Sequence, residues 1–384
     1  MSWGKVDIGN LVTLRQGFAI NKKTKHFLSD VPTDLPLLRI ADMKNGTENV
    51  FVNDTIPKKF IAKSDDIIYT RTGQVGLVFT NQFGVIHNNC FTVTPRDETI
   101  LCRRYLYYAL QDKAFFDEAN SKATGAAQPD LPHDAFNTIS IYLPPIDAQH
   151  RITDILSAYD DLIENNQKQI KLLEEAAQRL YKEWFVDLRF PGHEHTKIVD
   201  GVPEGWKRRK LVDIAQVQYG YAFDGSLFNS QKIGTPIIRI RNIPQGQTED
   251  YTPENVDSQY LVYNGDIIVG MDGEFHINTW AGDTAYLVQR TCRIKALTSD
   301  LNGFLLWAIY EPIKYFEKTV VGATVAHLGK KHIDTVEILV PTEKFYLPFK
   351  SLFEARLLLM NQNRALAEAR DRLLPKLMSG EVEV

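Results

Sequence analysis

The spacing of hydrophobic positions divides the chain into regions of two kinds. Short apolar runs at residues 37–40, 66–70 and 77–80 are bounded by glycine, asparagine or aspartate, which predicts β-strands. Between residues 103 and 121, Leu106, Leu110 and Phe115 recur at helical spacing among polar residues, which predicts a helix. This part of the chain is therefore of mixed α and β structure.

The same mixed pattern occurs a second time. Residues 36–46 read PLLRIADMKNG and residues 236–246 read PIIRIRNIPQG, so a proline opens each segment and a glycine closes it. Each segment predicts one strand running into one turn. Further matching pairs are 8–20 with 211–223, 64–76 with 264–276, 105–110 with 304–309, 125–131 with 322–328, and 138–145 with 335–342. The chain therefore contains two copies of one domain, and we expect recognition chemistry in their glycine-containing turns.

After each copy the hydrophobic spacing changes to alternating steps of three and four residues, which is typical of a coiled-coil seam. The first seam comprises Ile152, Leu156, Tyr159, Ile163, Asn166, Ile170, Leu173, Ala177, Leu180 and Trp184, and the second comprises Phe349, Phe353, Leu357, Met360, Asn363, Ala367, Leu374 and Leu377. We expect Arg370 to interrupt the second seam and Pro375 to end it. At ~1.5 Å per residue the first helix is about 50 Å long. Each helix leaves one domain copy with a single apolar stripe, which predicts an antiparallel pair.

Two asparagines occupy matching places near the midpoints of these helices. In an antiparallel pair the midpoints face each other, so our hypothesis is that the amides of Asn166 and Asn363 hydrogen-bond and fix the register. The alternative is that one or both side chains point outward. The residues predicted to pair the helices are Ile163, Asn166, Ile170, Leu173, Met360, Asn363 and Ala367.

The predicted organisation is a first domain at residues 1–146, a central long helix at 147–190, a second domain at 191–345 and a C-terminal long helix at 346–384. Domains held at opposite ends of an antiparallel helix pair present their loops with approximate dyad symmetry. A DNA duplex offers half-sites related in that way, ~34 Å apart for one helical turn. Because the copies differ in sequence, the predicted target is bipartite and asymmetric.

Composition limits the function classes. The 384 residues leave room for two or three domains, and 44% hydrophobic with 24% charged residues is ordinary for a folded chain. No run approaches the roughly 18 apolar residues of a membrane span, and residues 1–10 lack a secretory core, which predicts a cytoplasmic protein without membrane contact. Cys90, Cys102 and Cys292 have no Cys-x-x-Cys spacing and are predicted to be buried free thiols. With a net charge of −4, any DNA contact must come from local patches.

Arginine, glutamine and asparagine near turn glycines are the best candidates for reading base edges, because their side chains make paired hydrogen bonds in the major groove. The DNA-binding candidates are Arg71, Thr72, Gln74, Lys122, Thr124 and Gln128 in the first copy, and Arg239, Arg241, Asn242, Asp272, His276, Thr324 and His327 in the second. Two basic runs suit phosphates, which position DNA without specifying its sequence. These candidates are Lys22, Lys23, Lys25, Lys207, Arg208, Arg209 and Lys210. Ordinary solvated surface is the alternative for all of them, and Arg39 and Arg239 are alternatively buried partners of a carboxylate.

We predict no catalytic residue and no metal site. The chain lacks a glycine-rich nucleotide fingerprint, a Walker-type phosphate loop and an Asn-Pro-Pro-Tyr-like motif for a flipped adenine, and the glycines of 73–76 are interpreted as a turn. Asp-Met-Lys at 42–44 resembles half of a metal-dependent nuclease site, but the second copy has Asn-Ile-Pro at 242–244. His-Glu-His at 193–195 suggests a metal, but it follows Pro-Gly at 191–192 in a polar linker, so a solvated turn is favoured.

Three junctions carry a family resemblance: LPPIDAQHRITDIL at 143–156, RLYKEWFVDLRFPG at 179–192 and RDRLLPKLMSGEV at 370–382. With the order of blocks, they resemble the specificity subunit of type I restriction-modification systems over essentially the whole chain. The resemblance implies an α+β fold, with two tandem mixed α/β target-recognition domains separated by two long helices that form an antiparallel coiled coil. It also implies a non-catalytic recognition subunit without its own cofactor.

The implied partners are double-stranded DNA, methyltransferase (modification) subunits docked on the helices, and restriction and translocase subunits reached through the complex. S-adenosylmethionine, Mg²⁺ and ATP would belong to those subunits. Two other classes compete with this one. A two-domain coiled-coil adaptor for proteins or other ligands would not copurify with a methyltransferase, and a self-contained enzyme would bind S-adenosylmethionine or a divalent metal.

Overall fold

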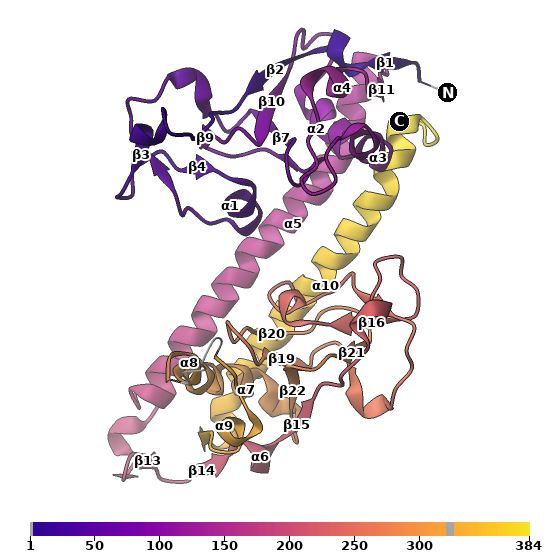
Figure 1. The fold of residues 1–384 in the computed structure, drawn as a ribbon. Helices are drawn as coiled ribbons and strands as arrows, with labels where there is room; N and C mark the ends of the chain where they lie inside the picture. The colour runs from indigo at the N-terminus through magenta and orange to yellow at the C-terminus, as the bar shows by residue number, and fades with distance from the viewer. Residues whose placement is uncertain (1–2, 320–325) are drawn as a thin grey trace. The chain divides into compact units, whose positions relative to one another are not determined.

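The computed structural model describes residues 3–319 and 326–384 (Figure 1). The chain divides into two compact units, one formed by Met1–Asp161 with Ala367–Val384 and the other by Leu162–Leu366. Each unit holds one mixed domain and part of each of two long helices, α5 (Ile146–Tyr181) and α10 (Glu343–Ser379). The α+β class predicted from the sequence, with two tandem domains and two long helices, is confirmed.

The first domain is built on a four-stranded antiparallel sheet, ordered β2–β10–β7–β8, and a smaller sheet ordered β4–β9–β6. Its strands are β1 (Lys5–Asp7), β2 (Val12–Gln16), β3 (Leu28–Ser29), β4 (Leu37–Leu38), β5 (Phe51–Val52), β6 (Ile61–Ala62), β7 (Ile67–Thr70), β8 (Val78–Phe79), β9 (Gly84–Ile86), β10 (Cys90–Pro95) and β11 (Ser140–Tyr142). Its helices are α1 (Ile40–Asn45), α2 (Arg103–Gln111), α3 (Lys113–Lys122) and α4 (His133–Asn137). The core of the larger sheet includes Tyr69, Phe91 and Phe136, all fully buried.

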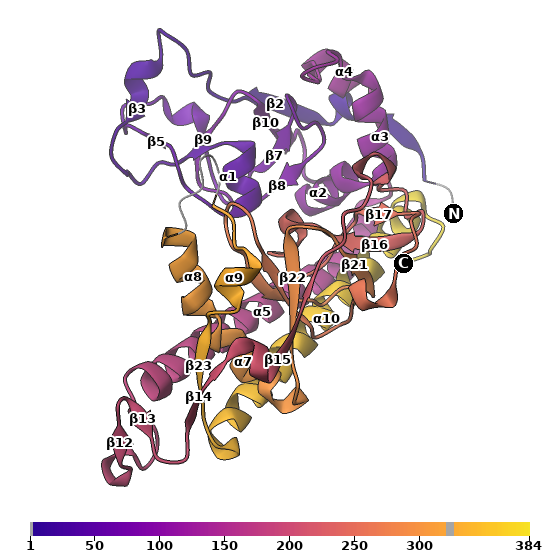
Figure 2. The ribbon, with the colours of Figure 1, turned by 60° about the horizontal axis from the view of Figure 1, so that its bottom comes forward.

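The second domain repeats this plan, with sheets ordered β15–β22–β19–β20 and β17–β16–β21–β18. Its strands are β12 (Ile198–Val199), β13 (Val202–Pro203), β14 (Lys207–Lys210), β15 (Ala215–Tyr219), β16 (Thr235–Ile238), β17 (Tyr251–Thr252), β18 (Leu261–Val262), β19 (Ile267–Gly270), β20 (Ile277–Thr279), β21 (Ala285–Leu287), β22 (Thr291–Ala296) and β23 (Glu337–Val340). Its helices are α6 (Leu211–Ile214), α7 (Asn302–Ala308), α8 (Tyr310–Thr319) and α9 (Lys330–Ile333). The small sheet and the β14–β23 pair lie at opposite ends of this domain (Figures 1 and 2).

The two copies also share a place where two backbone segments lie unusually close together. Gly17 and Gly220 lead into equivalent parallel bridges, Phe18 with His87 and Tyr221 with Val288. A Cβ added to Gly17 would lie 2.2 Å from the carbonyl oxygen of His87, and one added to Gly220 would lie 2.0 Å from that of Val288. Only glycine fits such a contact, so both copies keep it at the same place.

Two local predictions need correction. The segment predicted as one strand and one turn is β4 followed by helix α1, which Gly46 ends with a φ of 62°. In the second copy β16 is followed by a 3₁₀ turn, Ile240–Asn242. The single helix predicted over 103–121 is broken into α2 and α3, because the side chain of Asp112 accepts a hydrogen bond from the backbone of Ala114 and caps α3.

The prediction that Pro375 ends the last helix is wrong, since α10 continues to Ser379. Proline inside a helix removes one hydrogen bond and costs about 3 kcal/mol. The residues around it offset that cost, because Leu374, Leu377 and Met378 are buried in the core of the first unit. Burial of one such side chain contributes about 1.5–3 kcal/mol.

Within each unit the segments of α5 and α10 run antiparallel, as predicted. In the second unit, Arg356 donates to Glu174 at 2.7 Å, and Asn363 lies farther along α10 at the level of Ile163. Ile163, Ile170, Leu173 and Met360 are half-buried, as is Ala367 in the first unit.

Polar residues also lie along the helix pair. Arg370 interrupts the apolar seam, as expected, and its guanidinium donates to Asp160 of α5 in the first unit while α10 continues unbroken. Asn166 is 7% exposed, but its amide does not bond to Asn363. Among the residues that the structure describes, the Asn363 side chain donates only to the carbonyl of Ile163, at 3.4 Å. The predicted bond between the two amides is therefore wrong.

The three cysteines are free thiols. Cys90 and Cys292 are buried free thiols, and burial raises the pKa of each to about 12; Cys102 is half-buried and also free. Over the two described ranges, no helix combines the length and the apolar character needed to cross a membrane.

Candidate nucleic-acid interface

Two loops of the first domain meet at the end of β7. Residues 71–76 follow β7, residues 122–131 begin at the last residue of α3, and isolated bridges join Asp130 to Thr72 and to Thr124. The backbone amide of Gly73 donates to the carbonyl of Pro129 at 2.8 Å, and that of Leu131 donates to Arg71 at 3.0 Å. We call these two loops the first clasp. They form because Gly73 takes a φ of +86°, which glycine adopts without strain.

Side chains tie the first clasp together around Asp130. Arg71 donates to its carboxylate from Nε at 3.1 Å and from Nη2 at 2.6 Å, and the hydroxyl of Thr72 donates to the same group. Arg71 also donates from Nη1 to Gln16 Oε1 at 3.2 Å. The hydrogen bond from Arg71 lowers the pKa of Asp130, so the carboxylate stays ionised. Arg71 and Thr72, predicted to bind DNA, are thus engaged within the protein.

The second domain builds the same frame with other side chains. Residues 271–276 follow β19 and meet residues 326–328, with Gly273 donating to the carbonyl of Ala326 at 3.1 Å and Leu328 donating to that of Met271 at 2.8 Å. We call these segments the second clasp. Here the acidic residue, Asp272, lies on the first loop, and its carboxylate binds both His327 and Arg290.

The remaining clasp candidates are more accessible. Gln74 and Gln128 are exposed, and neither side chain hydrogen-bonds within the described chain. Lys122 contacts Thr138 at 3.1 Å, and the hydroxyl of exposed Thr124 lies 3.5 Å from the carbonyl oxygen of Asp130. In the second clasp the imidazole of half-buried His276 lies 3.6 Å from Glu274. Thr324 lies outside the described residues.

A second group of candidates lies on the small sheet of the second domain, away from the second clasp in sequence. Asp250 accepts hydrogen bonds from Arg241 and, at 3.1 Å, from Asn242. Burial of Asp250 opposes its ionisation, but these hydrogen bonds outweigh it and lower its pKa. The guanidinium of Arg239 lies 5.3 Å from the ring centre of Phe228. Phe228, Arg239, Arg241 and Asp250 help to line an open hollow of about 520 Å³.

In the first copy the equivalent of Arg239 is engaged differently. Arg39 donates to Asp42 at 2.6 Å, so Arg39 does pair with a carboxylate, although 39% of its side chain is exposed. Asp42 also accepts from Asn49 and Thr47. Burial opposes ionisation of Asp42, but these donors lower its pKa overall. Asp42, considered as half of a nuclease site, therefore helps to close the turn after α1.

The phosphate candidates are well placed for solvent contact. The side chains of Lys22, Lys23, Lys25, Lys207, Arg208, Arg209 and Lys210 are all exposed, and none forms an ion pair within residues 3–319 and 326–384. The last four make up β14, whose backbone pairs with β23. Alternating strand geometry sends their side chains to both faces.

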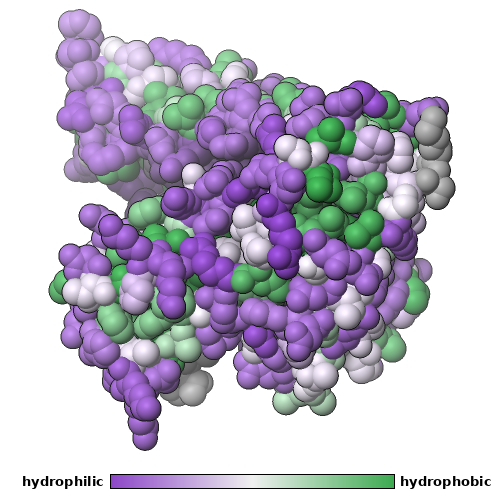
Figure 3. Space-filling model, turned by 90° about the horizontal axis from the view of Figure 1, so that it is seen from above, coloured by the Kyte–Doolittle hydropathy of each residue, from purple (hydrophilic) through white to green (hydrophobic). Residues whose placement is uncertain are grey.

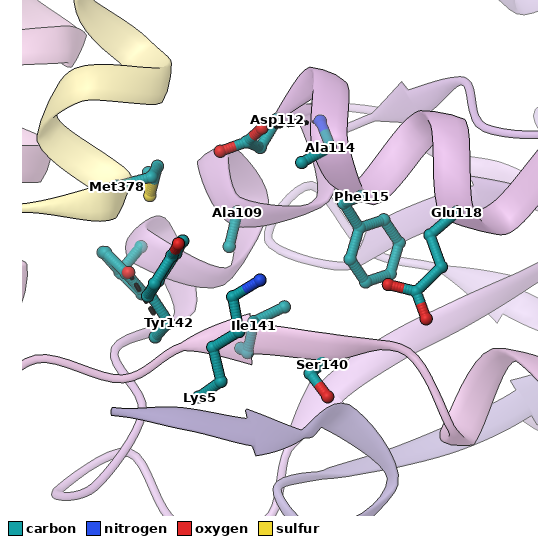
Figure 4. Close-up of a pocket in the computed structure, with 11 residues that line it drawn as sticks. Lys5, Ala109, Asp112, Ala114, Phe115, Glu118, Ser140, Ile141, Tyr142 and Met378 are labelled. Carbon is teal, nitrogen blue, oxygen red and sulfur yellow. Dashed lines mark hydrogen bonds between the residues drawn. The ribbon is translucent and has the colours of Figure 1, made fainter. Parts of the chain in front are cut away.

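The first unit contains a small cavity. A cavity of about 40 Å³ in the first unit is lined by Lys5, Asp112, Tyr142 and Met378 among others, and Lys5 lies 4.8 Å from the ring centre of Tyr142 (Figure 4). That volume holds a few water molecules, whereas small-molecule sites are ~300 Å³ or more. In the described part of the chain, no cluster of three histidine, cysteine or acidic residues is arranged to hold a metal ion.

Four residues of these sites were missed in the sequence: Gln16, Asp130, Asp250 and Arg290. Three of them act as partners across a long sequence separation, such as Gln16 with Arg71, whereas Asp250 pairs with Arg241 on the same small sheet. Asp130 was the easiest of the four to predict. It aligns with His327 of the second copy, and this alignment signals a difference of charge between the two loops.

Two domains of one topology, each with a loop clasp beside its main sheet, define a tandem recognition protein. Comparison with known proteins identifies its kind. Residues 1–175 and 203–344 match the family described as the type I restriction modification DNA specificity domain. The chain belongs to that family and is a DNA specificity subunit of a type I restriction-modification system. The resemblance noted in the sequence is confirmed.

Two relatives match over most of their length. The chain is 26% identical over 337 residues to the MjaIX specificity subunit of Methanocaldococcus jannaschii, covering 83% of this chain and 78% of that one. It is 24% identical over 406 residues to the MjaVIII specificity subunit of the same organism, covering 100% and 93%. The crystal structure of a type I S subunit from M. genitalium has a TM-score of 0.57 and 16% identity, covering 98% and 96% of the two chains, which is a likeness of fold.

Proposed function

We propose that each domain reads one half of a bipartite, asymmetric DNA target, and that the two helices set the spacing and dock methyltransferase subunits. The main support is the pair of clasps. Their backbone frames match, but Arg71, Thr72 and Asp130 stand where the second copy has Met271, Asp272 and His327. The two clasps thus share a backbone arrangement but present different side chains, which suits the recognition of two unlike half-sites.

Within each half, we assign different roles to engaged and free side chains. Gln74 and Gln128 are exposed and lack internal partners, so they are the first-domain candidates for base edges. Arg71, bound to Asp130, shapes the clasp that presents them. In the second domain, Arg239 and His276 are the matching candidates, because their contacts with the ring of Phe228 and with Glu274 at 3.6 Å are weak. The internal pairs of that domain are closer and involve Arg241, Asn242, Asp272 and His327.

The subunit itself is proposed to be non-catalytic. Adenine methylation and DNA cleavage would be performed by modification and restriction subunits, which would bring S-adenosylmethionine, Mg²⁺ and ATP. Apolar side chains remain exposed on α5, where Ile155, Leu162 and Leu172 have 38%, 51% and 63% exposure. Apolar patches also interrupt the mainly polar face in Figure 3. Such exposed apolar groups suit contact with another subunit.

Methylation mapping tests the function. A host carrying this gene with its modification partner is expected to show methylated adenine at one bipartite sequence with unlike halves. Gln128→Ala should change the bases selected in one half and leave the other half as it was. Removing one paired hydrogen bond to a base costs roughly 1–3 kcal/mol of discrimination. A continuous or symmetric target, or a change in both halves, would contradict the proposal.

The isolated chain supplies a second test. Because its net charge is −4, we expect weak, poorly specific DNA binding by the chain alone and rescue by the methyltransferase partner, which adds phosphate contacts. Copurification with a methyltransferase is expected, whereas an adaptor for other ligands would not bring one down. Tight and specific binding by the chain alone would contradict the proposal that the methyltransferase partner supplies the missing phosphate contacts.

A further inference from the structure

A buried arginine connects the helix pair of the second unit to its recognition domain. Arg356 of α10 has a side chain that is only 9% exposed, and its Nε donates to Glu174 of α5 at 2.7 Å. Its Nη2 donates to the side-chain oxygen of Asn278 in β20 at 2.6 Å. One guanidinium therefore joins both helices and the domain.

Asn278 extends this connection to the small sheet. Its side-chain nitrogen donates to the carbonyls of Ile243 and Pro244, both at 2.9 Å. These two residues directly follow the turn that carries Arg239, Arg241 and Asn242. A continuous series of hydrogen bonds thus runs from α5, through α10, to the segment with the DNA-binding candidates.

The first unit has a related but looser arrangement. Arg370 of α10 donates to Asp160 of α5 at 2.5 Å, and the hydroxyl of Tyr108 in α2 donates to the same carboxylate at 2.6 Å. The Arg370 side chain is 26% exposed, and α2 carries none of the DNA-binding candidates. Of these two arginines of α10, Arg356 is therefore the one that is connected to a recognition segment.

We propose, building on the proposed DNA function, that Arg356 is a positioning residue that determines how strictly the second domain selects the spacer between half-sites. Adding one base pair to a spacer moves a half-site by about 3.4 Å along the duplex and rotates it by about 35°. A recognition segment connected to both helices through Asn278 and Arg356 cannot follow that movement, so a wrong spacer prevents its side chains from reaching the bases. A recognition segment attached flexibly to the helices would tolerate the change in spacer length.

A binding selection on the assembled complex tests this role. A DNA library keeps both half-sites constant and varies the spacer by single base pairs, and the ratio of bound preferred to bound neighbouring spacers is read by sequencing. Arg356→Met keeps the length of the side chain and removes its charge and donors. We expect the ratio to fall by about tenfold, because the hydrogen bonds of a coupled network are broken together, with unchanged base preference in the first half-site. Arg372→Met, which removes an arginine that is 80% exposed on the same helix, should leave the ratio unchanged.

A second variant covers the case in which Arg356→Met fails to fold. Glu174→Gln keeps an acceptor for Arg356 but removes the ion pair, so a smaller fall in the spacer ratio is expected. A lower unfolding temperature with wild-type spacer selection in either variant would overturn the proposal, because it would show a structural role only. Failure of the wild-type complex to select any DNA would instead refute the proposed function itself.

Discussion

Arg71 and Asp130 form a two-point ion pair that closes the first clasp, with Nε and Nη2 of the arginine 3.1 and 2.6 Å from the two carboxylate oxygens. The pair joins loops that are far apart in the sequence. It changes the interpretation of Arg71, because a guanidinium already bound on two sides has few donors left for a base.

The clasp predicts a pH dependence of stability. The bond from Arg71 lowers the folded-state pKa of Asp130 below its unfolded value of ~3.9. Its stabilising contribution is therefore complete above about pH 4 and disappears as pH falls through the folded pKa. Asp130→Asn should lower the unfolding temperature at neutral pH, and the difference from wild type should shrink below about pH 4.

Thermal unfolding over a pH series measures this effect. Asp54→Asn, at an exposed position, is the matched control and should follow the wild-type curve. A difference between Asp130→Asn and wild type that grows on acidification would contradict the role of the ion pair.

The basic strand β14 predicts a loss of affinity without a loss of specificity. Changing Lys207, Arg208, Arg209 and Lys210 to glutamine removes exposed charges and keeps the backbone pairing with β23. Binding of the assembled complex should weaken equally on all DNA sequences. The slope of log affinity against log salt should become shallower by about 1 for each phosphate that is no longer neutralised.

Salt titrations with specific and unrelated duplexes check this prediction. The ratio of the two affinities should stay constant. An altered ratio would mean that β14 reads bases, and an unaltered salt slope would mean that it does not touch phosphates.

Substitution of either Gly17 or Gly220 is expected to destabilise the protein strongly and to a similar extent. An added Cβ at Gly17 or Gly220 meets a backbone carbonyl that cannot move aside. Overpacking of this kind costs typically about 1–3 kcal/mol. Gly17→Ala and Gly220→Ala should each lower the unfolding temperature by several degrees, whereas Gly225→Ala, with no atom within 4 Å of the new Cβ, should not. Equal stability of all three variants would be inconsistent with the packing of the strands.

The asparagine inside the helix pair predicts a stabilising substitution. Asn166 is 7% exposed, and its side chain makes no hydrogen bond within the part of the chain that the structure describes. Burial of an amide without partners is costly, so Asn166→Leu should raise the free energy of unfolding by about 1 kcal/mol. Calorimetry would measure it, with the exposed neighbour variant Asn165→Leu as control. A destabilised Asn166→Leu, or one that no longer assembles with methyltransferase subunits, would restore a role for this amide in register.

Local patterns predicted the architecture well. The strand runs and the two seams depend on side chains within a few residues of one another, and the repeat is visible when two stretches of the sequence are compared. All correspond to observed strands or helices, from β7 to α10. The errors arose where tertiary contacts outweigh local preference. Pro375 stays helical because its neighbours are buried, and the segment from 103 to 121 divides where Asp112 caps a new helix.

The sequence alone thus determined that this protein has two copies of one domain and two long helices, because periodicity and internal repetition are written along the chain. Only the tertiary structure decided which polar side chains are free to meet DNA. Arg71 finds Asp130, Arg241 finds Asp250, and Arg356 finds Glu174 and Asn278. Those pairings depend on loops and helices that approach one another in space, and a charge engaged in such a pair is no longer available to a base or a phosphate.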